Sequence, residues 1–214
     1  MDEKQLKLYR YKLSGMLKEC NIEDEDGFIS LTRYWGTDMI FNIPDFIDSI
    51  GSGAFLSNKC LECVRIPESV KTIGYECFMD CRILRQVVLP KSIEFIGSDT
   101  FHNCVMLKSV NLQDLNTSDY KTLYSDMFCK CSSLEEIIIP DGITDLGIGC
   151  FADCTQLRSV KLPDSVEVIN DYCFKGCVLL DEINIPKRLK FCASTAFYGC
   201  RDYVSSEFKR FICR

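Results

Sequence analysis

Phenylalanine recurs along the chain at a nearly constant interval, and its neighbours recur with it. Successive phenylalanines are 23 residues apart, with one interval of 27. Three residues after the first is Asn58, and three residues after each of the others is a cysteine. A fixed period of this length is typical of solenoids, whose stacked units share one core. The phenylalanines are Phe55, Phe78, Phe101, Phe128, Phe151, Phe174 and Phe197, and the cysteines are Cys81, Cys104, Cys131, Cys154, Cys177 and Cys200.

A strand pattern follows the cysteine or Asn58 in each of the first six units. The chain reads L-x-x-[IV]-x-[IL] from Leu61, and the same pattern usually ends in a proline such as Pro67. Alternating apolar positions predict a half-buried strand. Proline predicts its end, because it has no N–H to donate to a neighbouring strand. Aliphatic residues three and six positions later predict a second wall of the core.

Glycine follows that second apolar pair in four units, at Gly51, Gly74, Gly97 and Gly147, and Asn170 takes the same position in a fifth. Glycine and asparagine tolerate positive φ angles better than other residues do. The column therefore predicts a left-handed backbone conformation at this point of the coil.

The consensus C-x-x-L-x-x-[IV]-x-[IL]-P-x-x-[VI]-x-x-I-G-x-x-x-F-x-x-C resembles the BspA-like class of leucine-rich repeats over residues 37–200. The resemblance implies an α/β, mainly β, repeat fold: a right-handed leucine-rich-repeat solenoid of about seven coils. It also implies a recognition scaffold, because BspA-like repeats occur in bacterial surface and adhesion proteins and in protozoan relatives.

The ends of the chain depart from the repeat. Apolar residues at Leu6, Tyr9, Leu13, Met16, Leu17 and Cys20 are three or four apart, which predicts an N-terminal capping helix. We expect residues 23–27 to form an acidic loop and residues 28–34 to form a first strand. The predicted organisation is a cap over residues 1–36, the solenoid over 37–200 and a C-terminal cap over 201–214.

The fourth unit is irregular. Between Leu112 and Phe128 it carries four extra residues and no proline, so residues 113–122 are predicted to bulge from the solenoid as a loop. Two interpretations stay open: sequence drift in a tolerant loop, or a role in contacting a partner.

Charge and hydropathy narrow the function classes. The net charge of −6 and pI of about 5.0 argue against a nucleic-acid partner, which needs a basic surface. The longest apolar runs, such as residues 137–139, are far shorter than the roughly 20 residues of a membrane helix. The first twenty residues lack the apolar core of a secretory signal. We therefore expect a cytoplasmic protein if the chain is full length, and a secreted or cell-surface protein if it is a fragment.

The chain has fifteen cysteines but no cluster that the repeat leaves unexplained. Cys60, Cys63, Cys77 and Cys81 resemble four zinc ligands, but the last two recur as repeat columns. We interpret the column cysteines as buried, free structural thiols. His102, the single histidine, is expected to face solvent. No catalytic, cofactor-binding or metal-binding residue is predicted. A thiol-based redox or metal-responsive protein, or an enzyme with a site grafted onto the solenoid, are alternatives.

Recognition in solenoids lies on strand side chains that point away from the core. We predict a non-enzymatic protein-interaction module that binds a protein of unknown identity through its concave strand face. We expect the chain itself to be a monomer. A fragment of a bacterial surface or adhesion protein is the alternative. The predicted partner-binding residues are Arg65, Arg85, Val88, Lys108, Asn111, Glu136, Ile138, Arg158 and Lys161.

Overall fold

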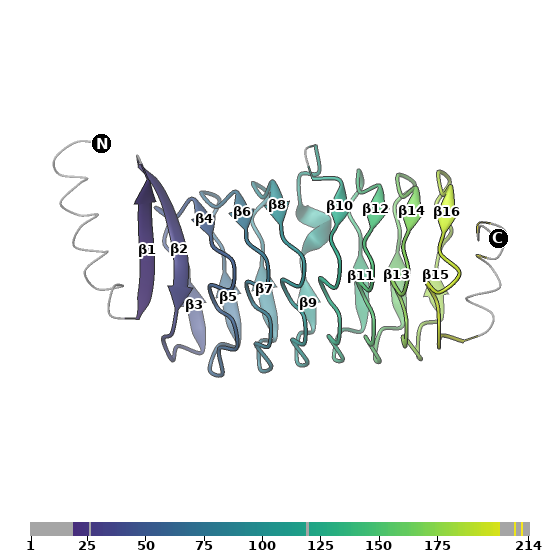
Figure 1. Ribbon diagram of the computed structural model, residues 1–214, viewed down its shortest axis with the longest axis horizontal. Coiled ribbons are helices and arrows are strands. Elements are labelled where there is room, and N and C mark those ends of the chain that lie inside the picture. The colour runs from purple at the N-terminus through teal and green to yellow at the C-terminus, as the bar shows by residue number, and fades with distance from the viewer. Residues whose placement is uncertain (1–18, 26, 119, 202–207, 209–210, 212–214) are drawn as a thin grey trace.

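The computed structural model describes residues 19–25, 27–118, 120–201, 208 and 211. Seven coils stack into a rod that is nearly straight in Figure 1, and each coil contributes one of the seven repeat phenylalanines. We number the coils 1 to 7 from the one that contains Phe55 to the one that contains Phe197. The predicted mainly β solenoid of about seven coils is confirmed.

Each coil contributes one strand to a parallel wall that we call the strand face. This wall consists of two sheets, one of order β3-β5-β7-β9 and one of order β11-β13-β15. The proline that follows most of these strands accepts a hydrogen bond in a turn, as from Val70 N to Pro67 O (3.1 Å). The strands are β3 (Ile40–Asn42), β5 (Cys63–Arg65), β7 (Gln86–Val88), β9 (Ser109–Val110), β11 (Glu136–Ile138), β13 (Ser159–Lys161) and β15 (Glu182–Ile183).

A second wall of short strands faces the first across the core. It also consists of two sheets, of order β1-β2-β4-β6-β8 and β10-β12-β14-β16. Its members are β1 (Cys20–Glu25), β2 (Phe28–Tyr34), β4 (Ser49–Ile50), β6 (Thr72–Ile73), β8 (Phe95–Ile96), β10 (Thr122–Leu123), β12 (Asp145–Leu146), β14 (Val168–Ile169) and β16 (Phe191–Cys192).

The repeat phenylalanines form a continuous ring stack through the core. Neighbouring rings are 4.9 to 5.6 Å apart and within 17° of parallel. Tyr34 lies 5.2 Å from Phe55 at one end, and Phe208 lies 4.7 Å from Phe197 at the other. Because each ring is fully or almost fully buried, the stack adds aromatic contacts to the hydrophobic stabilisation of the core.

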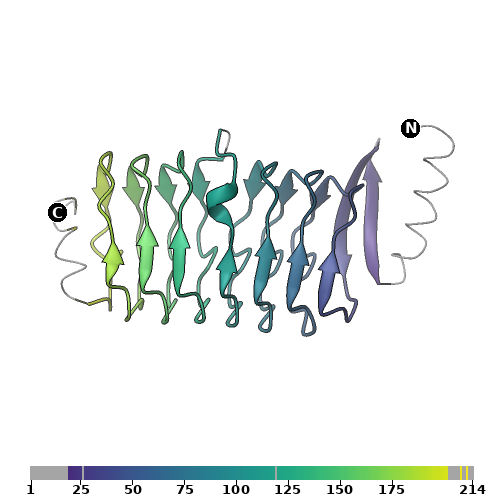
Figure 2. The same cartoon turned by 180° about the vertical axis from the view of Figure 1, so that it is seen from behind.

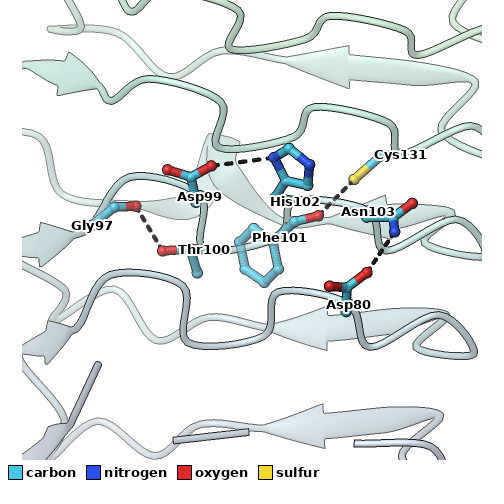
Figure 3. Close-up of polar contacts among 8 residues, drawn as sticks. All are labelled: Asp80, Gly97, Asp99, Thr100, Phe101, His102, Asn103 and Cys131. Atoms are coloured by element: carbon cyan, nitrogen blue, oxygen red, sulfur yellow. Dashed lines mark hydrogen bonds and ion pairs between the residues drawn. The ribbon is translucent and has the colours of Figure 1, made fainter. Parts of the chain in front are cut away.

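The cysteine after each phenylalanine donates a hydrogen bond to the coil before it. Cys131 Sγ, for example, lies 3.1 Å from the carbonyl oxygen of Phe101 (Figure 3). The same bond recurs at Cys81, Cys104, Cys154, Cys177 and Cys200, at 3.0 to 3.1 Å. In coil 1, Asn58 Nδ2 donates instead to Gly36 O (3.0 Å). A small side chain that satisfies a buried carbonyl explains why this column admits cysteine and asparagine.

The prediction of positive φ angles in the glycine column is wrong. None of Gly51, Gly74, Gly97 and Gly147 is among the described residues with positive φ. Glycine is needed there because the coils approach closely: a Cβ on Gly97 would lie 2.6 Å from the backbone nitrogen of Tyr75. Positive φ angles occur instead two residues before and two residues after the phenylalanine, as at Asp99 (58°) and Asn103 (59°).

The N-terminal end of the solenoid begins with a strand where the sequence predicted a loop. The predicted first strand over residues 28–34 is confirmed as β2, but the acidic segment is not a loop: residues 23–25 belong to β1, which pairs antiparallel with β2. Cys20, predicted to lie in the capping helix, begins β1. The rest of that helix falls in residues 1–18, outside the described residues. Acidic side chains on an edge strand oppose pairing with another chain.

The C-terminal cap of residues 201–214 lies largely outside the described residues. Of its described members, Phe208 is fully buried and Phe211 packs against the core. Within the described part of the chain, no helix is long and apolar enough to cross a membrane.

The four extra residues of coil 4 interrupt both walls. They follow η1 (Leu112–Asp114), a 3-10 turn that is the single helical element within residues 19–25, 27–118 and 120–201. The segment packs onto the rod, since Leu115, Thr117 and Tyr120 are buried. On the strand face, β9 and β11 belong to different sheets, and on the second wall β8 and β10 do too.

Candidate partner-binding face

The predicted partner-binding residues all lie on the strand face or at its margins, because they alternate with the buried positions of β5 to β13. Seven of them are exposed, whereas Val88 and Asn111 are half-buried. The exposed members are Arg65, Arg85, Lys108, Glu136, Ile138, Arg158 and Lys161. The structure separates this set into a group that lines a groove and a group that does not.

A groove of about 430 Å³ opens where the strand face is interrupted. Residues of β7 and β9 line one side, residues of β11 line the other, and two residues of η1 complete the lining. Figure 2 shows the strand face in front, with the short helical turn of η1 above it. Five predicted residues line it: Val88, Lys108, Asn111, Glu136 and Ile138. The predicted loop and the predicted face therefore meet at one place, which the periodicity alone does not reveal.

Asn111 explains why β9 ends early. Its side chain takes over the pairing of a strand residue: Oδ1 accepts from Leu89 N (2.8 Å) and Nδ2 donates to Leu89 O (3.0 Å). Nδ2 also lies 3.2 Å from Asp114 Oδ2 in η1. The chain then turns into η1 and does not continue alongside β11. Asn111 thus shapes the groove, and much of its amide is already bonded to the protein.

The groove combines apolar and charged walls. Ile138 is 44% exposed, an unusual exposure for an aliphatic side chain, and Val88 lies across from it in the lining. Lys108, Asp114 and Glu136 supply charges of both signs at its margin. An apolar floor with a polar margin is the usual arrangement of a protein-binding surface.

A second, more polar depression of about 590 Å³ continues along the face. It shares Lys108 and Glu136 with the groove and adds Arg158. Four carboxylates line it, from Glu135, Glu136, Asp181 and Glu182. Acidic groups therefore outnumber basic ones at this end of the strand face.

The remaining predicted residues lie outside both linings. Arg65 and Lys161 are exposed on β5 and β13, and Arg85 Nε lies 3.3 Å from Glu62 Oε2. The ion pair holds Arg85 on the surface of its own protein. Arg65, Arg85, Arg158 and Lys161 are thus spread along the rod, and none of them lines the groove.

Seven groove residues were absent from the predicted set, and two of them belong to the coil 4 insertion and not to a strand. Gln113 and Asp114 line it from η1, inside the insertion that was predicted as a loop. The signal for them was the insertion itself, because an interruption of a regular repeat is where new surface can form.

Most of the column cysteines are buried, as predicted. Cys77 and Cys81 are buried, and Cys60 and Cys63 are half-buried free thiols. Burial raises the pKa of Cys81 to about 12 and raises that of Cys77 well above its usual value. A protonated, enclosed thiol is a poor nucleophile. His102, however, was predicted to face solvent and does not: its side chain is 18% exposed.

Comparison with known proteins identifies the repeat. The sequence profile of the BspA type leucine rich repeat region matches residues 39–121 and 121–212 and has six copies. The comparison with curated proteins gave no significant match.

Solved structures of bacterial leucine-rich-repeat proteins are similar to this chain. The Treponema pallidum protein TpLRR is 28% identical with a TM-score of 0.79, and the match covers 91% of this chain and 94% of that one. A leucine rich cell surface protein from Faecalibacterium prausnitzii is 29% identical with a TM-score of 0.76, over 85% of this chain and 51% of that one. A leucine-rich repeat protein from Eubacterium ventriosum is 28% identical, with a TM-score of 0.73, over 84% and 50%.

This chain spans about half the length of the latter two proteins. The profile match and the seven-coil architecture agree on one assignment, and no enzyme family is indicated. The chain belongs to the BspA-type leucine-rich-repeat family.

Proposed function

We propose that this chain is a non-enzymatic recognition module that binds a protein through the strand face, with the groove between β9 and β11 as the centre of the contact. The observation that carries this proposal is the exposed Ile138, which lines a groove together with Val88 where the strand face is interrupted. The partner's contact is expected to insert an apolar side chain there.

Size and charge support a protein partner over a small metabolite. The groove and the adjoining depression are open and shallow, and together they extend over coils 3 to 7. Small-molecule sites, in contrast, enclose most of their ligand. The net charge of −6 disfavours nucleic acid. The monomeric state of the free chain stays a prediction.

The first experiment substitutes Ile138→Glu in the intact chain and measures capture of proteins from the native source, followed by the Kd for the captured partner. A buried carboxylate at the centre of the contact should weaken binding about 30-fold or more, the scale of an interface residue worth at least about 2 kcal/mol.

The matched control is Ile148→Glu. Ile148 is 50% exposed and follows β12 on the other wall, so the same substitution should leave binding unchanged. The Arg85→Glu and Arg158→Glu variants test the rest of the predicted face. Equal binding by the Ile138→Glu and wild-type chains would move the contact away from the groove.

A cell-surface location is the second part of the proposal. It rests on the relative from Faecalibacterium prausnitzii, which is described as a cell surface protein, and it replaces the expectation of a cytoplasmic protein. Fractionation of the native cells, with surface proteolysis as readout, tests the location.

A further inference from the structure

A cluster of metal-binding side chains lies on the opposite margin of coils 3 and 4 from the groove, at the turn that carries the phenylalanines. His102, Asp126 and Cys129 each place one ligand atom within 4.8 Å of the others. His102 and Asp126 are half-buried and Cys129 is buried. Figure 3 shows His102 at this turn, beside the carboxylate of Asp99.

The cluster arises from two repeat columns. His102 and Cys129 each directly follow the phenylalanine of their coil, and Asp99 and Asp126 each precede it by two residues. Stacking places the members of one column side by side, since Asp99 N bonds to Ser125 O (3.0 Å) and Asn103 N to Cys129 O (2.8 Å). In coil 2 the same columns hold Glu76 and Met79, and in coil 5 they hold Gly149 and Ala152. The combination of imidazole, thiol and carboxylates occurs at the junction of coils 3 and 4.

The imidazole is held without a hydrogen bond. Its Nδ1 is buried and has no hydrogen-bond partner among the described residues, although Asp99 Oδ1 lies 3.2 Å away. At this distance the two groups would form an ion pair when the imidazole is protonated. A buried ring nitrogen without a partner is costly for a protein. The ring is therefore positioned for an additional partner.

Negative charge is also concentrated here. Asp99 Oδ1 lies 3.2 Å from His102 Nδ1, and a carboxylate oxygen of Asp126 lies within 4.8 Å of a ring nitrogen of the same imidazole. Gly149 keeps space beside Asp126, because a Cβ at this position would collide with Asp126 Oδ1. Two carboxylates kept close together in a half-buried position repel each other, and a cation between them would relieve that repulsion.

We propose that coils 3 and 4 bind one zinc ion through His102, Asp126 and Cys129, with Asp99 beside the imidazole to offset the charge of the ion. Nitrogen, sulfur and oxygen together are the donor set that Zn²⁺ favours. The ligand atoms of a tetrahedral zinc are roughly 3.3 to 3.8 Å apart, as follows from bonds of about 2.0 to 2.3 Å. The separations of up to 4.8 Å in the structure would have to shorten by about 1 Å for the three atoms to share one ion. Cys129 loses its proton to the solvent when it binds, so one proton is released with the thiolate ligand.

The repeat supplies variants that should fold. His102→Leu introduces the residue that coil 1 has at this position (Leu56), Cys129→Ala the residue of coil 5 (Ala152), and Asp126→Gly the residue of coil 5 (Gly149). Each variant removes one ligand and introduces a residue that another coil already has in the same column. Unchanged melting temperatures in the presence of a chelator establish that each variant is folded.

The experiment titrates Zn²⁺ into the reduced, metal-stripped chain in competition with a chromophoric chelator. The wild type should bind one zinc per chain, and each of the three variants should bind it at least about tenfold more weakly, a loss that even residues behind the ligands can cause. The double variant Cys60→Ser with Cys63→Ser removes the other local thiol pair and should bind zinc as the wild type does.

Cobalt provides a spectroscopic readout of the thiolate ligand. Co²⁺ bound to the wild type should show a thiolate-to-cobalt charge-transfer band, and Cys129→Ala should lack it. Absence of zinc binding by the wild type, absence of the band, or loss of binding in the Cys60/Cys63 variant alone would each overturn the proposal. Because these residues lie away from the groove, none of these results bears on partner binding.

Discussion

Single residues in this fold are chosen by what the neighbouring coil places against them. The glycine column shows this clearly. Its members were predicted to have positive φ angles, but their φ angles are not positive. Glycine is needed there because the neighbouring coil leaves no room for a Cβ. Composition cannot separate the two reasons for glycine, because both the angle and the close approach exclude a Cβ. The two reasons predict different outcomes when residues are exchanged.

Gly97→Ala should destabilise the chain, because its Cβ would lie 2.6 Å from Tyr75 N, a backbone atom that can move only with its coil. We expect a loss of about 1 to 3 kcal/mol in the free energy of unfolding, measured by urea denaturation. Tyr172→Gly is the contrasting change. Tyr172 has a φ of 58° in the column of Gly53 and Gly149, so glycine should cost less than about 1 kcal/mol there. Equal losses in the two variants would contradict this account.

At the scale of elements, the insertion in coil 4 determines where the regular stack is interrupted. Between coils 5 and 6, Arg158 N donates a hydrogen bond to Glu135 O (2.8 Å). The equivalent hydrogen bond between coils 4 and 5, from Glu135 N to Lys108 O, is absent from the described structure. At the phenylalanine turns the stack continues, since Phe101 N still bonds to Met127 O (2.9 Å) and Phe128 N to Cys150 O (2.8 Å). The rod therefore stays intact along one edge while it opens at the strand face.

Removing the insertion should close the groove. Residues 113–121 can be replaced by Pro-Asp-Ser-Val-Glu, the sequence of residues 163–167 in the regular coil 6, which shortens coil 4 by the four extra residues. The amides of Glu135 to Ile138 should then exchange with solvent more slowly, because β9 and β11 can pair. Hydrogen exchange by mass spectrometry measures this, with β13 as the internal reference. Unchanged protection of β11 would show that the break has another cause.

The elements that could be predicted from the sequence are those that the period repeats. Six of the seven strands of the strand face, β5 to β15, follow a leucine of the pattern, and repetition gives several independent readings of each position. The insertion occurs once, so the sequence predicts a loop but gives no indication that Leu115 and Tyr120 are buried. The acidic residues of β1 likewise suggest a loop by composition, and only their pairing with β2 makes them a strand. The residues proposed to bind zinc occupy two columns of the repeat, but the sequence analysis considered His102 without the residues that the next coil places beside it.

Across the whole molecule, the repeat places one cysteine column after another in the core. Burial raises the pKa of seven of these thiols well above the usual value of 9.0: Cys77, Cys104, Cys131, Cys150, Cys154, Cys173 and Cys177. Folding thus requires the protonated thiol in coil after coil. The consequence for stability is additive along the rod and depends on pH.

The chain should unfold steeply under alkaline conditions. Above the pKa of an unfolded thiol, close to 9, the unfolded chain releases protons that the folded chain retains, so stability is full below that pH and falls as pH rises. Each thiol contributes about 1.4 kcal/mol per pH unit, and seven together would lower a stability of about 5 to 15 kcal/mol to zero within roughly one to two units.

Circular dichroism against pH, with reductant present, measures the midpoint of this transition. The double variant Cys150→Ala with Cys173→Ala provides the test, because Ala54 and Ala196 already occupy the same column in coils 1 and 7. Removing two buried thiols reduces the slope, so the midpoint should move to higher pH even if the variant is slightly less stable at pH 7. A midpoint that does not move, with stability at pH 7 unchanged, would show that tyrosines or lysines, and not the cysteine columns, set the alkaline limit of this rod.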